Sequence, residues 1–203
     1  MRPHLKLFLP GLSALLSSPI CAQHDPTPAR RGPFFLTVQI GGGQGVVAVG
    51  AGCWLAHQKL EPEVLVGYVP LSIGGRPMAI FTFKTTYTPY SPNLGTNLQV
   101  SPVSLGAFVN YTTGEQFFLT NNSAGRYPKG YYWWSSAIRV GALVGARVTH
   151  EASRLGLNGL PRRTTLYGEL STNDLYLVSK VTNKSVSLPD ILTLGLGVKA
   201  GGK

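Results

Sequence analysis

The stretch from Ile138 to Thr149 constrains the fold most, because its residues alternate strictly between two kinds of side chain. One parity is apolar throughout: Ile138, Val140, Ala142, Val144, Ala146 and Val148. The other parity is mostly charged, polar or glycine: Arg139, Gly141, Leu143, Gly145, Arg147 and Thr149. Successive residues of a β-strand point to opposite faces. Such a strand is either half-buried in a soluble sheet or stands in a membrane barrel between lipid and a polar lumen.

The same alternation recurs along the chain and predicts eight strands. We expect them within residues 34–40, 46–56, 63–69, 78–88, 98–112, 127–150, 163–171 and 191–199. The fifth is expected to bend near Pro102, and no segment after the first residues shows sustained helical periodicity. Small membrane barrels cross the bilayer with strands of this length, about 9 to 11 residues per crossing.

The N-terminal residues are typical of a secretory signal. Arg2, His4 and Lys6 precede a short apolar run, and Ile20-Cys21-Ala22 resembles a cleavage site. We therefore predict a signal peptide at 1–22, a flexible lead-in at 23–33, a barrel domain at 34–199 and a tail at 200–203. A signal peptide directs the chain to export.

The shortage of charge favours lipid over water outside the barrel. Only 13% of the 203 residues are charged, and 25 are glycine, whereas soluble domains average roughly a quarter charged. The less apolar face of most strands carries Gly, Ser, Thr, Asn and Tyr. These features predict an all-β fold, an antiparallel up-and-down transmembrane β-barrel of eight strands.

The interior of an eight-stranded barrel is narrow and filled by side chains, so charges inside it need partners. Glu169 with Arg139 or Arg147 is the candidate lumen charge pair. Tyr131, Tyr132, Trp133 and Trp134 are candidates for the aromatic girdle at the membrane interface.

The net charge of +10 does not indicate a nucleic-acid partner. The basic residues are scattered, and no nucleic-acid-binding motif is present. An exported basic chain more plausibly meets anionic lipid headgroups or lipopolysaccharide phosphates.

Five segments carry a resemblance to a known class: Leu65–Gly75, Phe108–Phe118, Arg126–Ser136, Tyr167–Ser179 and Asp190–Lys199. Through them the chain resembles the small outer-membrane β-barrel proteins of Gram-negative bacteria, and most closely an uncharacterised group of exported Bacteroidota barrels. The resemblance implies residence in the cell outer membrane, contact with its lipid and lipopolysaccharide, and handling by the barrel assembly machinery. Such barrels usually end on an aromatic residue, whereas this sequence ends Lys199-Ala200-Gly201-Gly202-Lys203.

The sequence suggests no catalytic residues, no metal site and no cofactor. His150, Glu151 and Ser153 are near neighbours, but a Ser-His-acid set needs geometry that adjacent residues on one chain seldom supply. The expected role is structural or surface-binding. One alternative is a barrel enzyme that modifies lipid A or another outer-leaflet lipid, and another is a soluble periplasmic β-barrel that binds an apolar ligand. A packed apolar centre containing Val140, Val144, Leu194 and Leu196 would exclude the membrane assignment.

Overall fold

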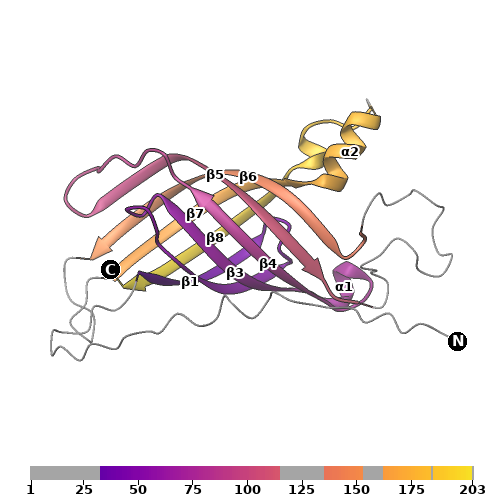
Figure 1. Cartoon of the computed structure of the whole chain (residues 1–203), viewed down its shortest axis with the longest axis horizontal. Helices are drawn as coiled ribbons and strands as arrows, with labels where there is room; N and C mark the ends of the chain where they lie inside the picture. Colours follow the sequence, from indigo (N-terminus) through magenta and orange to yellow (C-terminus); the bar gives the residue numbers. More distant parts are fainter. Residues whose placement is uncertain (1–32, 115–134, 153–161, 184, 203) are drawn as a thin grey trace, which may run out of the picture. The chain divides into compact units, whose positions relative to one another are not determined.

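The fold is a closed barrel of eight antiparallel strands arranged in sequence order (Figure 1). The computed structural model describes residues 33–114, 135–152, 162–183 and 185–202. The strands are β1 (Phe34–Gly41), β2 (Val47–Cys53), β3 (Leu60–Val69), β4 (Met78–Tyr87), β5 (Leu98–Thr112), β6 (Ile138–Ala152), β7 (Arg162–Asn173) and β8 (Thr193–Gly202). The predicted all-β, up-and-down, eight-stranded barrel is therefore confirmed.

Pairing of the first and last strands closes the sheet. Phe35 lies opposite Gly201, and Val38 lies opposite Val198. β8 also pairs with β7 along its whole length and continues to Gly202, beyond the strand end expected at Lys199. No strand among the eight is left with a free edge, which removes the unpaired backbone groups that favour aggregation.

The strand boundaries follow the sequence pattern closely for β5 but differ from it at the start of β3. β5 spans the expected residues, and its pairing with β6 shifts register between Ser101 and Ser104, on either side of Pro102. β3, however, begins at Leu60, where the sequence suggested a turn through Pro62. This extension places Glu61 within the barrel wall.

Two short helices and a 3-10 turn interrupt segments that were expected to be irregular: α1 (Leu71–Gly74), α2 (Asp174–Thr182) and η1 (Pro189–Ile191). Helix α2 was not expected, because no segment after the first residues shows sustained helical periodicity. Asn173 caps α2 by accepting a hydrogen bond from the Tyr176 backbone N–H, and Asp174 occupies its first turn. No helix in the described ranges is long and apolar enough to cross a bilayer.

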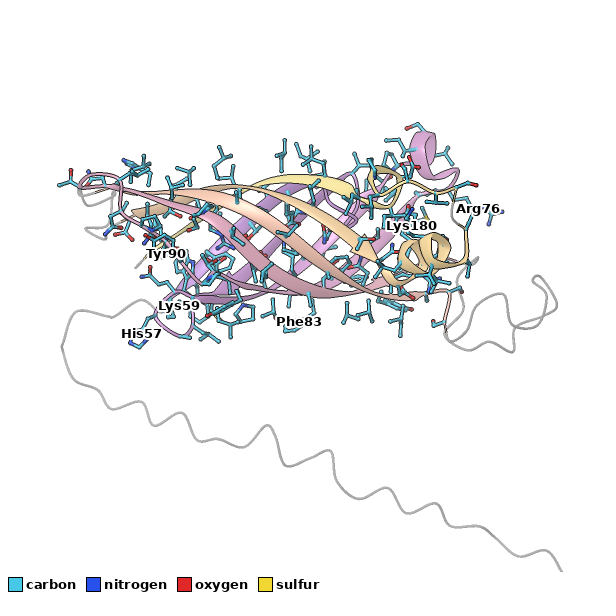
Figure 2. All side chains as sticks on the ribbon, turned by 90° about the horizontal axis from the view of Figure 1, so that it is seen from above. His57, Lys59, Arg76, Phe83, Tyr90 and Lys180 are labelled. Carbon is cyan, nitrogen blue, oxygen red and sulfur yellow. The ribbon has the colours of Figure 1, made fainter. Side chains whose placement is uncertain are left out.

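The barrel wall carries apolar side chains outside and mainly polar or charged side chains inside, with a few apolar residues such as Leu65 and Phe108 also buried. Val140, Val144, Leu194 and Leu196 are all exposed. Arg147 and Thr149, on the opposite parity of β6, are buried. In Figure 2 the ring of Phe83 projects outward from the wall, while the neighbouring Lys84 is fully buried. The arrangement is the reverse of a soluble protein, in which buried side chains are mainly apolar.

Candidate functional site in the barrel interior

Six charged side chains form a continuous network of alternating sign across the barrel interior, here called the ion network. Its links are Arg147–Glu61 at 2.6 Å, Glu61–Lys199 at 2.8 Å, Lys199–Glu63 at 2.9 Å, Glu63–Lys84 at 3.2 Å and Lys84–Glu169 at 3.2 Å. The distances join the charged nitrogen and oxygen atoms. Three carboxylates thus balance three cations, as buried charges require.

Neutral side chains complete the ion network. Gln39 donates from Nε2 to Glu169 at 2.7 Å and accepts at Oε1 from Lys84 at 2.8 Å and from the Tyr167 hydroxyl at 2.8 Å. Thr37 donates to Glu63 at 2.8 Å. The Lys84 and Glu63 side chains are 0% exposed. The centre of the barrel is therefore filled by hydrogen-bonded polar groups.

These residues converge because they occupy inward positions on several strands. Gln39 lies on β1, Glu61 and Glu63 on β3, Lys84 on β4, Arg147 on β6, Glu169 on β7 and Lys199 on β8. Gly197 makes room for Tyr167, since a Cβ at that glycine would lie 2.4 Å from the tyrosine hydroxyl oxygen. Small and large inward residues thus interlock, as a narrow barrel requires.

The sequence-based candidates for the lumen pair acquire different partners. Arg147 and Glu169 both lie in the ion network, but Arg147 pairs with Glu61 and Glu169 pairs with Lys84. Arg139 lies further along β6, and its Nη1 is 3.6 Å from the Asp174 carboxylate. The candidate girdle residues Tyr131, Tyr132, Trp133 and Trp134 lie outside the described residues.

The turn between β1 and β2 folds across one end of the barrel. Ser171 donates its hydroxyl to the Gly42 carbonyl at 2.7 Å, and Asn110 donates its amide to the Gly43 carbonyl at 2.9 Å. Gln44 follows in the same turn and is completely buried. Side chains from β5 and β7 therefore tie this turn over the interior and close that end.

The opposite end, where β2, β4 and β6 finish, contains a pocket of about 290 Å³ that we call the turn-end pocket. Its floor is made of buried residues and its rim of exposed ones. In Figure 2 the rim residues His57, Lys59 and Tyr90 lie at this end, and Arg76 and Lys180 lie at the other. The turn-end pocket is larger than the adjoining pocket of about 210 Å³, which Gln58 and Gln99 also line.

Of the residues considered for catalysis, the structure describes His150 and Glu151, and they lie on opposite faces of β6. His150 is exposed on the outer parity of β6, whereas Glu151 lies 3.7 Å from Arg163 on the inner parity. Ser153 lies outside the described residues. Within those residues no group of three or more His, Cys, Asp or Glu side chains could hold a metal ion.

Sequence reasoning missed the two carboxylates that link the network. Glu61 fell in an expected turn, and Glu63 was not considered although it lies on the inward parity of β3.

Comparisons with protein-family models, curated proteins and solved structures found no match to this chain. The geometry of the barrel itself therefore carries the functional argument.

Proposed function

We propose that the chain is an integral outer-membrane β-barrel with a structural or surface-binding role. The observation that carries this proposal is the distribution of side chains on the wall. Every charged strand residue whose exposure is described is buried or half-buried and lies on the inward parity. Hydrocarbon tolerates an apolar outer face and penalises charge on it, whereas water imposes no such restriction.

Each strand contributes large apolar side chains to the outside, so the apolar face continues around the barrel. We take one example from each strand, and all eight side chains are between 46% and 68% exposed: Leu36, Val49, Val64, Phe83, Leu105, Val144, Leu166 and Leu194. Soluble monomers rarely expose an apolar patch above a few hundred Å². A lipid bilayer is the environment that would cover such a surface.

The filled interior supports a structural or binding role over that of a general pore. The ion network occupies the centre, and the β1–β2 turn covers one end. The polar interior also gives little support to the alternative of a soluble barrel that binds an apolar ligand, because such sites are lined mainly by apolar side chains.

The proposed partners follow from location and surface. Outer-membrane lipid would contact the wall, and lipopolysaccharide phosphates would meet exposed basic residues at the barrel ends, such as Lys59 or Arg76. The barrel assembly machinery would insert the chain after export through the N-terminal signal. Helix α2 exposes Leu177, Val178 and Val181 beside Lys180, a composition suited to the boundary between acyl chains and headgroups.

Cell fractionation tests the proposed location. We expect the chain in the outer-membrane fraction, resistant to high-salt extraction and released by detergent. Unboiled and boiled samples should migrate differently on a denaturing gel, because the closed hydrogen-bonded sheet resists unfolding without heat. Recovery in the soluble periplasmic extract, with no gel shift, would reject the membrane proposal.

Planar-bilayer recording tests the structural role. Because the Lys84 and Glu63 side chains fill the centre, we expect no steady single-channel conductance from the purified chain. A general porin of larger strand number, reconstituted in the same way, serves as the positive control. Stable open channels at low voltage would contradict the filled interior and favour a transport role.

A further inference from the structure

The turn-end pocket has a buried floor rich in hydrogen-bond donors. Its floor includes Glu61, Thr88, Ser101, Arg147 and Arg163, and its rim includes His57, Lys59, Pro89 and Tyr90. Arg147 and Arg163 are only 6% and 5% exposed. Three side chains of positive charge line the pocket and are opposed there by Glu61, while the Glu151 carboxylate lies beside the pocket, 3.7 Å from Arg163. The local balance is therefore positive, unlike that of the ion network.

The two arginines retain donors without acceptors. Arg147 donates only from Nη1, to Glu61, within the residues that the structure describes. Arg163 donates from Nη1 to Gln58 and from Nη2 to Gln99, the latter at 3.2 Å. In both, Nε is buried and has no hydrogen-bond partner among the described residues, and the same holds for the Thr88 hydroxyl. A guanidinium has five N–H donors. A buried donor that has no acceptor lowers the stability of the fold.

A turn with strained backbone forms one side of this pocket. Ala56, His57 and Gln58 are consecutive non-glycine residues with φ of 48°, 56° and 67°. Left-handed backbone at such residues is unfavourable and concentrates at functional sites. The turn brings Gln58 onto Arg163, which is also held by the Trp54 ring 5.3 Å away. The arginine is thus fixed in place from two sides.

We propose that the turn-end pocket binds a small water-soluble oxyanion, a compound bearing carboxylate or phosphate groups, against Arg147 and Arg163. Such an anion supplies the acceptors that the buried guanidiniums and Thr88 lack. Arginine is suited to this task because its planar donor fork matches carboxylate and phosphate oxygens. The volume of about 290 Å³ limits the ligand to a few-carbon compound. The inference does not rest on the membrane location.

Isothermal titration calorimetry on the purified full chain in an uncharged detergent tests the proposal. The probes are citrate and inorganic phosphate, with glucose as the neutral control and dihexanoyl phosphatidic acid as a lipid-borne phosphate. We expect saturable binding of citrate or phosphate and none of glucose. If the phosphatidic acid bound more tightly than both free anions, the proposal of a water-soluble ligand would be overturned. The pocket would then be assigned to the phosphate of a lipid headgroup.

Matched variants locate the site. Arg163→Gln should weaken binding at least about tenfold, because a charge-assisted hydrogen bond is lost. Arg76→Gln removes a cation at the other end of the barrel and should leave affinity within about twofold. Thr88→Val replaces only the hydroxyl by a methyl group and should weaken binding about two- to tenfold. This variant decides the question if Arg163→Gln does not fold. Absence of saturable binding up to about 10 mM probe, or unchanged affinity in folded variants, would overturn the proposal.

Discussion

Phe83→Arg is expected to destabilise the barrel in lipid vesicles by about 2–4 kcal/mol, because it places a charge on the outer wall. Phe83 lies midway along β4 and is 54% exposed. Its cross-strand neighbours are Val64 on β3 and Val109 on β5, both exposed and apolar. The measurement is the free energy of unfolding from urea titrations of the full chain in phosphatidylcholine vesicles.

Leu94→Arg is the matched control for this substitution. Leu94 is also an exposed apolar residue, but it lies in the connection between β4 and β5 and outside the barrel wall. Its replacement should cost at most about 1 kcal/mol. If Phe83→Arg were as harmless as Leu94→Arg, the wall would face water, since an exposed phenylalanine in water is replaced by arginine with little loss.

The sequence predicts the wall of the barrel well, because strand faces are encoded by local alternation. In β6 the residues assigned to the apolar parity are exposed, apart from the half-buried Ile138, and Arg147 and Thr149 on the other parity are buried. The bounds of β5 also follow from alternation, and Pro102 correctly marks the register shift. Alternation requires no knowledge of which strands meet across the barrel.

The partners inside the lumen could not be predicted in the same way, because they depend on register and closure. Glu169 and Lys84 are far apart in sequence and lie on strands that are not neighbours in the sheet. Glu61 was not placed in a strand because Pro62 follows it, and proline usually argues against a strand interior. Helix α2 was missed because nine residues are too few for a clear period, although Asn173–Asp174 is a recognisable N-terminal signal.

The fold and the turn-end pocket therefore rest on different information. Alternation and low charge define a barrel with an apolar exterior. The pocket, by contrast, arises where the connection between β2 and β3 brings Gln58 to Arg163 of β7, which also bonds Gln99 of β5. The strain at Ala56–Gln58 is not visible in the sequence, because none of these residues is a glycine. A site built from such parts is found only once the strand pairing is known.

Lys84→Met should destabilise the barrel by about 3–5 kcal/mol, because it leaves a buried carboxylate without its cation. Lys84 Nζ lies 3.2 Å from both Glu63 and Glu169 and donates to Gln39 at 2.8 Å. After the substitution, three carboxylates face two cations, and among the described residues Glu169 keeps only the hydrogen bond from Gln39. The measurement is again urea unfolding in vesicles. Lys59→Met, at the exposed rim of the turn-end pocket, should change stability by at most about 0.5 kcal/mol.

Adding Glu169→Gln to Lys84→Met restores the balance of charge, with two carboxylates and two cations left in the ion network. We therefore expect the double variant to recover about 1–2 kcal/mol relative to Lys84→Met alone, because contacting residues couple strongly. A double variant less stable than Lys84→Met would show that Glu169 stabilises the barrel without its lysine. In that case pairing between these two residues would not be what holds the centre of the lumen together. Gln39, which accepts a hydrogen bond from the Tyr167 hydroxyl, would remain as the group that fixes Glu169 in place.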